Sequence, residues 1–146
     1  MGNMTQEDFD DAVRALLRSR PVIAVVGASK KPERPSHHVM TDLIAAGYEV
    51  IPVHPAHAEV LGRRTYPNLA AIPGPVDIVD VFRRSDFTPD VARQAVAKGA
   101  RVLWLQVGVI SDEARRIAEG GGLMVVMDRC LSVEHYRLLE SDPATS

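Results

Sequence analysis

Basic side chains cluster in one short loop of the sequence, in a pattern suited to binding a phosphorylated ligand. The loop covers residues 27–36 and reads GASKKPERPS. Gly27 allows a tight turn and a close approach by a phosphate, and the hydroxyls of Ser29 and Ser36 can donate hydrogen bonds. Lysine and arginine supply the positive charge that phosphate oxygens require. The loop therefore predicts an anion-binding site, and its basic residues are Lys30, Lys31 and Arg34.

Other basic residues also follow predicted strands. Eight of the 17 lysines and arginines occupy such positions: Lys30, Lys31, Arg34, Arg63, Arg64, Arg83, Arg84 and Arg129. The carboxyl ends of parallel strands share one edge of a sheet, so we expect these cations to focus a positive potential there. Solvated surface lysines would be the simpler explanation of the loop alone. In a protein of net charge −2, a cluster of cations at one edge favours an anion-binding site over a solvated loop.

Five short apolar runs alternate with amphipathic segments along the chain. The runs predict strands at 22–26, 48–53, 77–82, 102–105 and 123–127. The intervening patterns predict helices at 5–18, 36–46, 89–98, 112–119 and 132–139. Such alternation indicates an α/β fold, a Rossmann-like open parallel five-stranded sheet with helices on both faces. We expect the strand order 3-2-1-4-5, one domain over residues 1–140 and a flexible tail at 141–146.

The fold class places the ligand site. Ligands of open α/β sheets bind outside the carboxyl ends of the strands, at the point where the strand order reverses. We expect that point beside the first strand, where loop 27–36 leads into a helix whose first N–H groups are free. After the fourth strand, Gln106 and Gly108 could close the pocket with amide donors and a close-approach glycine. Gly108 could instead serve only the turn into the next helix.

Composition excludes several classes of protein. The net charge of −2 argues against a general nucleic-acid binder. Every apolar run is far shorter than a membrane span requires, and the N-terminus does not resemble a secretory signal. A single cysteine, Cys130, favours a reducing compartment. We therefore expect a cytoplasmic protein without nucleic-acid or membrane partners.

A nicotinamide dinucleotide is the first alternative ligand for this fold. The loop after the first strand lacks the G-x-G-x-x-G pattern, and the second strand ends in Val53-His54-Pro55 where an acidic residue should bind the ribose. No P-loop pattern occurs in the sequence. An NAD(P)-dependent oxidoreductase remains the second interpretation.

No catalytic or metal site follows from the residue pattern. His37 and His38 are adjacent, so their side chains diverge on a helix, and the residues between His54 and His57 include Pro55. We therefore expect no metal ligand and no catalytic residue. Cys130 follows the fifth strand, beside Arg129 and before a helix, as reactive cysteines often do. It indicates a redox or regulatory protein as a further alternative, while an inert, half-buried cysteine is the simpler interpretation.

Five segments of the sequence resemble a known family. VVGASKKPERPSHHV, GYEVIPVHP, VDIVDVFRR, WLQVGV and VMDRC occur in this order. They are similar to motifs of the small CoA-binding proteins, single-domain relatives of the CoA-binding domain of the succinyl-CoA synthetase α subunit. The resemblance covers about residues 20–131. It implies that loop 27–36 cradles phosphates and that Pro52–Pro55 borders the adenine. The implied CoA contacts are Gly27, Ala28, Ser29, Lys30, Arg34, Ser36, Val53, Pro55, Phe82 and Arg83.

The resemblance also limits the expected activity. In the synthetases, ligase chemistry needs a further domain with a phosphorylated histidine and a nucleotide-grasping partner subunit, and 146 residues hold neither. We expect a protein that binds CoA or an acyl-CoA without ligase activity of its own. Gln106 and Gly108 are expected contacts in addition to the implied ones. A CoA-linked redox or regulatory protein that uses Cys130 is the further alternative. Phe82 could instead belong to the core. A homodimer is an expected assembly, because small open sheets commonly dimerise.

Overall fold

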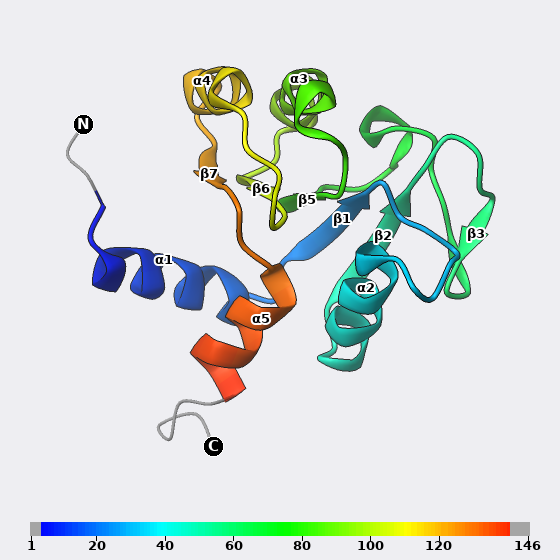
Figure 1. Cartoon of the computed structure of the whole chain (residues 1–146), viewed down its shortest axis with the longest axis horizontal. Coiled ribbons are helices and arrows are strands. Elements are labelled where there is room, and N and C mark those ends of the chain that lie inside the picture. The colour runs from blue at the N-terminus through cyan, green and yellow to red at the C-terminus, as the bar shows by residue number, and fades with distance from the viewer. Residues whose placement is uncertain (1–3, 141–146) are drawn as a thin grey trace.

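A parallel five-stranded sheet forms the centre of the molecule (Figure 1). The computed structural model describes residues 4–140. The sheet has the order β2-β1-β5-β6-β7, with β1 and β5 inside it. Its strands are β1 (Val22–Val26), β2 (Glu49–Val53), β5 (Ile78–Val81), β6 (Val102–Leu105) and β7 (Met124–Val126).

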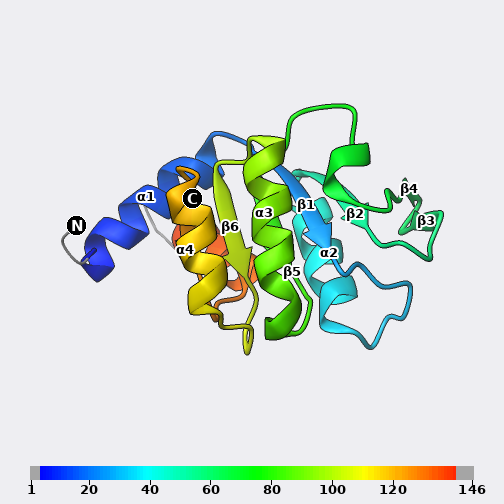
Figure 2. The same cartoon turned by 90° about the horizontal axis from the view of Figure 1, so that it is seen from above.

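Helices cover both faces of this sheet, which confirms the predicted Rossmann-like α/β class (Figures 1 and 2). One face packs against α1 (Gln6–Arg18), α2 (Pro35–Ala45) and α5 (Leu131–His135), which continues as a π-helical turn over Tyr136–Glu140. The other face packs against α3 (Thr88–Lys98) and α4 (Asp112–Gly120). Alternate strand residues supply the two apolar layers, so Val25 faces the first set of helices and Ala24 the second.

The predicted strand order 3-2-1-4-5 is wrong. The third predicted strand, β5, pairs with β1 rather than with β2, so the order in chain numbering is 2-1-3-4-5. Pro52 in β2 gives the physical reason. Proline has no N–H to donate, so it is confined to edge strands. The oxygen of Pro52 accepts a hydrogen bond from Tyr66 N on the outer side of β2 (3.1 Å), which leaves the missing donor facing away from β1.

The connection between β2 and β5 contains short elements that the sequence did not predict. β3 (Glu59–Val60) and β4 (Arg63–Arg64) form an antiparallel hairpin, and a 3-10 turn follows at Leu69–Ala71. Another 3-10 turn, Ser85–Phe87, precedes α3. These elements are too short to produce a hydrophobic period. Hydrogen bonds to Tyr66 attach this connection to the open edge of β2.

Other predicted boundaries agree with the structure to within about two residues. Thr5 is the N-cap of α1, and α5 begins at Leu131 instead of Ser132. The predicted flexible tail, 141–146, lies outside the described residues. Among residues 4–140, no helix is both long and apolar enough to span a bilayer.

Candidate functional site

A cleft of about 870 Å³ lies at the carboxyl ends of β1, β2, β5 and β6. This is where the strand order reverses, because the chain runs from β1 to β2 on one side and returns to β5 on the other. The cleft is therefore at the position that the fold class predicts for a ligand. Its lining residues are Gly27, Ala28, Ser29, Lys31, Arg34, Pro35, Ser36, His54, Pro55, His57, Phe82, Arg83, Arg84, Gln106, Val107, Gly108 and Val109.

Gly27 shapes the floor of this cleft. It adopts φ +90°, a left-handed conformation that other residues rarely take. A Cβ at this position would lie 2.8 Å from the carbonyl oxygen of Phe82. The N–H groups of Gly27 and Ala28 both donate to the oxygen of Val53, at 3.0 and 3.3 Å. The glycine therefore brings the ends of β1, β2 and β5 together, and the two amides hold the loop instead of facing the ligand.

The next part of the loop presents the N-terminus of α2. Arg34 is the N-cap residue, but no side chain caps the helix among the described residues, and Pro35 occupies the first turn. Ser36 is buried and lines the cleft. In the first turn of α2, Pro35 has no N–H and His37 N donates to the oxygen of Arg34 (3.0 Å), which leaves the N–H of Ser36 at the positive end of the helix dipole. The start of α2 can therefore bind an anion together with the side chains around it.

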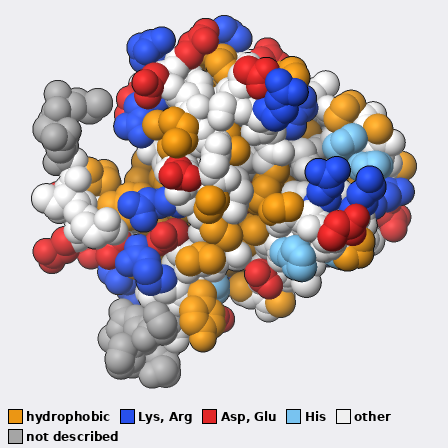
Figure 3. Space-filling model, in the orientation of Figure 1, with side chains coloured by type: hydrophobic (Ala, Val, Ile, Leu, Met, Phe, Trp, Pro, Cys, Tyr) orange, Lys and Arg blue, Asp and Glu red, His pale blue; other side chains and the backbone are white. Residues whose placement is uncertain are grey.

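Four cations line the cleft, namely Lys31, Arg34, Arg83 and Arg84, and no Asp or Glu among the described residues does so. Arg84 also forms an ion pair with Asp86 (3.1 Å), while Arg83 lies 4.7 Å above the ring of Phe87. Figure 3 shows basic and histidine side chains, with some acidic ones, on the side of the molecule where the loop after β1 lies. The charge of the cleft itself suits a polyanion.

Four of the eight cations expected at this edge do not line the cleft, namely Lys30, Arg63, Arg64 and Arg129. Arg63 and Arg64 line a different hollow beside Val22 and Glu49, the first residues of β1 and β2. They belong to the β3–β4 hairpin, which folds back toward the amino ends of the strands. The guanidinium of Arg129 lies 4.5 Å above the ring of Phe9 and 3.4 Å from Glu134. Position after a predicted strand was therefore not enough to assign a side chain to the cleft.

His54 and His57 also line the cleft, although their spacing in the sequence had raised only the question of a metal site. The rings of His54 and His57 stack with their centroids 4.2 Å apart and their planes at 25°. The Nδ1 atom of His54 accepts a hydrogen bond from Ala56 N (2.9 Å). Burial lowers the pKa of His54, and the neighbouring His57 and Arg83 lower it further. Their position after the second strand, on the same edge as loop 27–36, was the signal that could have placed them in the site.

Gln106 and Gly108 differ in what they can offer a ligand. Gln106 is buried, and its side-chain oxygen has no hydrogen-bond partner among the described residues. The N–H of Gly108 instead donates to Asp128 Oδ1 (2.7 Å). The unpartnered oxygen of Gln106 is itself buried, while the amide of Gly108 helps to fix the turn after β6.

The structure brings ten of the twelve predicted contact residues to the cleft. Lys30 is exposed and does not line it, whereas its neighbour Lys31 does. Val53 is buried in the core and borders a smaller adjoining cavity of about 110 Å³. Phe82 both lines the cleft and packs against the core, so the two interpretations of this residue are compatible.

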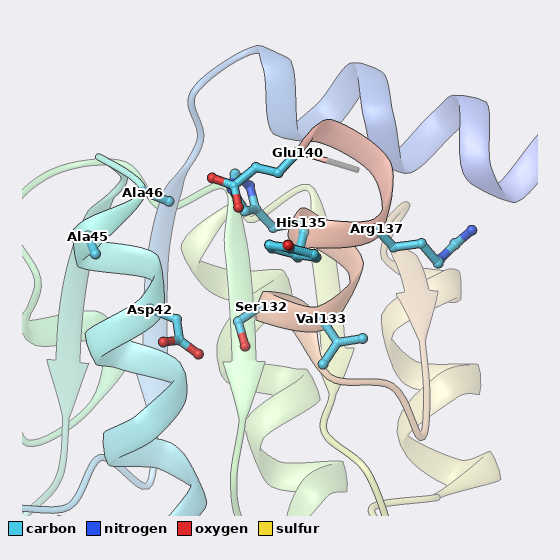
Figure 4. A pocket seen from close by; sticks show the side chains of 9 residues that line it. Asp42, Ala45, Ala46, Ser132, Val133, His135, Arg137 and Glu140 are labelled. Carbon is cyan, nitrogen blue, oxygen red and sulfur yellow. The ribbon is translucent and has the colours of Figure 1, made fainter. Parts of the chain in front are cut away.

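A second cavity, of about 670 Å³, lies between α2 and α5 (Figure 4). At its wall, the hydroxyl of Tyr48 lies 2.6 Å from His135 Nδ1, and His135 Nε2 lies 3.6 Å from Glu140. Burial raises the pKa of Tyr48 to about 12, so its hydroxyl stays protonated. The carboxylates of Asp42 and Glu140 line this cavity. They disfavour a polyanion, in contrast to the cleft after β1.

Cys130 lies apart from the cleft. It packs against the apolar layer beneath α1, α2 and α5, and its sulfur lies 3.4 Å from the Ser132 hydroxyl. Within residues 4–140, no three His, Cys, Asp or Glu side chains are grouped so that they could hold a metal ion.

Comparisons with known proteins match most of the chain. The family described as "CoA binding domain" matches residues 21–136. The uncharacterized protein YneT of Bacillus subtilis (strain 168) is 42% identical over 123 residues, which are 84% of this chain and 91% of YneT. A protein from Pyrococcus horikoshii OT3 is 41% identical and has a TM-score of 0.88, with 95% of this chain and 99% of that one covered.

A longer relative is an enzyme subunit. The α subunit of acetate–CoA ligase (ADP-forming) I from Pyrococcus furiosus is 32% identical over 105 residues. The matched region is 68% of this chain but only 22% of that subunit.

Proposed function

The chain belongs to the CoA-binding domain family, and we propose that it binds CoA or an acyl-CoA in the cleft at the carboxyl ends of β1, β2, β5 and β6. The observation that carries this proposal is the charge of the cleft, where four cations and the N-terminus of α2 meet and no carboxylate of residues 4–140 lines the cleft. Because the matching region is a small part of the ligase subunit, we propose cofactor binding without ligase activity.

The phosphates of CoA fit the residues around loop 27–36. CoA carries a pyrophosphate and a 3′-phosphate, and guanidinium groups bind phosphate oxygens through paired hydrogen bonds. Lys31, Arg34 and Ser36 would hold the phosphates beside the start of α2, above the surface that Gly27 leaves open. Arg83 and Phe82, from the end of β5, would lie along the cofactor.

The remaining lining residues fit the less charged parts of the cofactor. Pro55 offers an apolar surface after β2, and Gln106 and Gly108 line the cleft after β6. An NAD(P) site would instead require an acidic residue after β2. That position carries His54, so the cleft does not favour the dinucleotide. We further propose that the protein acts in a reducing cytoplasm, in keeping with its single cysteine.

Calorimetric titration with CoA, acetyl-CoA, NAD and NADP tests the ligand and the site together. We expect CoA or acetyl-CoA to bind with a Kd on the order of micromolar, and no heat from the dinucleotides. Lys31→Ala combined with Arg34→Ala should weaken CoA binding by at least about tenfold, since each removes a charge-assisted contact. The melting temperature should barely change, because both residues are exposed.

Arg63→Ala with Arg64→Ala is the matched control, because it removes two cations outside the cleft. This variant should bind CoA as the wild type does. Binding of NAD in place of CoA would overturn the proposed ligand. An equal loss of CoA affinity in the two double variants would overturn the proposed location of the site.

A further inference from the structure

The stacked histidines at the end of β2 line the cleft but are not among the CoA contacts proposed above. We propose that His54 and His57 form a phosphate subsite, in which His54 donates a hydrogen bond from its neutral ring and His57 takes up a proton when the phosphate binds. This inference deepens the proposed function and rests on it, because the phosphate belongs to CoA. It predicts that the protein binds its ligand more tightly as pH falls.

The hydrogen bond from Ala56 fixes the chemical form of His54. Because Nδ1 accepts the N–H of Ala56, the hydrogen of the neutral ring is on Nε2. A second proton would have to occupy Nδ1 and would break this hydrogen bond. Burial and the nearby Arg83 also lower the pKa of His54. The hydrogen bond to Nδ1 therefore holds His54 as a neutral donor that can serve a phosphate oxygen.

The ring of His57 makes no hydrogen bond to any residue that the structure describes. It lines the same cleft and faces the neutral ring of His54 instead of a second cation. A proton on His57 gives the subsite a positive charge next to the bound phosphate, and a nearby opposite charge favours the charged form of an imidazole. The proton comes from solvent, and no covalent bond changes.

The charged groups around the pair make the bound phosphate the partner that stabilises this proton. The cations that line the same cleft are Lys31 and Arg34 from the loop before α2, and Arg83 and Arg84 after β5. The acids carried by the surrounding elements are Glu33, Glu59, Asp86, Asp90 and Asp128, and none of them lines the cleft. Asp86 pairs with Arg84, and Asp90 borders the small adjoining cavity with Pro55 and Arg83. Because no Asp or Glu of the described residues lines the cleft, a bound phosphate would be the anion next to His57.

Calorimetry in two buffers of different ionisation enthalpy measures the protons taken up on binding. We expect the wild type to take up part of one proton per CoA near neutral pH, and to bind CoA about tenfold more tightly at pH 6 than at pH 8, which corresponds to a shift of about one pKa unit. The CoA monoester phosphate itself titrates near pH 6. The decisive quantity is therefore the difference between the wild type and His57→Gln, in which the titration of the ligand cancels.

The two histidines should give different results when replaced. His57→Gln should remove the additional proton uptake and most of the pH dependence. His54→Asn keeps an oxygen where Nδ1 accepts from Ala56, but it lacks the Nε2–H donor. This variant should lose about tenfold in affinity at both pH values while it retains the proton uptake. His38→Gln, on α2 and outside the cleft, should match the wild type in both measurements.

Dephospho-CoA identifies which phosphate the pair binds. Proton uptake that is lost with this ligand assigns the subsite to the 3′-phosphate, and uptake that persists assigns it to the pyrophosphate; both results support the inference. CoA binding with equal proton uptake in the wild type and His57→Gln would overturn the inference and leave the proposed function intact. Absence of CoA binding at both pH values would overturn the inference and the proposed function together.

Discussion

Gly27 is the residue on which the geometry of the cleft most depends. The left-handed backbone at this position costs a residue with a Cβ about 1–2 kcal/mol, and the added atom would also collide with the carbonyl oxygen of Phe82. Gly27→Ala should therefore lower the free energy of unfolding by more than about 2 kcal/mol and weaken CoA binding. Urea denaturation and calorimetric titration measure the two effects.

Gly99 provides the matched control for this substitution. It has φ +80°, but apart from its two chain neighbours no described residue has an atom within 4 Å of the position that its Cβ would occupy. Gly99→Ala should show the backbone cost alone, about 1–2 kcal/mol, with unchanged CoA affinity. If the two variants were equally stable and bound CoA equally well, contact between Gly27 and β5 would not shape the site.

Single residues of the site were predictable where one loop carries them. Gly27 to Ser36 follow a strong strand signal, so their position at the sheet edge required only the fold class. Arg63 and Arg64 were misplaced because their position depends on a two-residue hairpin that leaves no pattern in the sequence. His54 and His57 were noticed as a pair, but their stacking in the cleft depends on the turn that Ala56 closes.

Among the elements, α1 shows how a local motif supports a helix outside the family match at 21–136. The hydroxyl of Thr5 accepts from Asp8 N (3.0 Å), and the carboxylate of Asp8 accepts from Thr5 N (3.4 Å). Thr5→Ala should lower the free energy of unfolding by about 1 kcal/mol, since it leaves a helix N–H without its acceptor. CoA affinity should not change, because α1 does not line the cleft.

Chemical denaturation followed by circular dichroism measures this loss. Thr5→Ser keeps the accepting hydroxyl and should stay close to the wild type. If serine proved as destabilising as alanine, the methyl group of Thr5 rather than its hydrogen bond would support α1.

The order of the strands was the main error at this scale, and Pro52 carried the missing information. The predicted order placed the second strand between two neighbours, a position in which proline would remove a ladder hydrogen bond. The complete burial of Ile78–Val81 points the same way, since a strand that is buried on both faces belongs inside a parallel sheet. The periodicity of apolar residues predicts where helices and strands lie. Which strands pair with each other depends on single hydrogen-bond donors, such as the N–H that Pro52 lacks.

The stability of the whole molecule should depend on pH through one carboxyl group at the centre of the sheet, that of Asp80. Asp80 in β5 is completely buried between Val25 and Trp104 in the strand register, and neither carboxylate oxygen has a partner among the described residues. Burial raises the pKa of Asp80 well above its ordinary value. The folded protein therefore keeps a proton on this carboxyl that the unfolded chain releases above about pH 4.

This difference sets the sign of the effect on stability. Between the unfolded and folded pKa values the unfolded state binds fewer protons, so the contribution of Asp80 to stability falls as pH rises, by up to about 1.4 kcal/mol per pH unit. Asp10 acts in the opposite sense, because the hydrogen bond from Arg137 holds its pKa at about 2, and its contribution disappears only in stronger acid. The range from pH 4.5 to pH 7.5 therefore isolates the effect of Asp80 from that of Asp10.

Asp80→Asn replaces the carboxyl by a neutral amide of the same shape and should remove this loss of stability. Relative to the wild type, the variant should gain stability as pH rises above about 4.5, whatever constant offset its own unpaired amide introduces. Urea unfolding monitored by Trp104, the single and fully buried tryptophan, measures the difference at each pH. Parallel curves for the two proteins would mean that Asp80 ionises equally in the folded and unfolded states, and that solvent or a cation reaches the centre of the sheet.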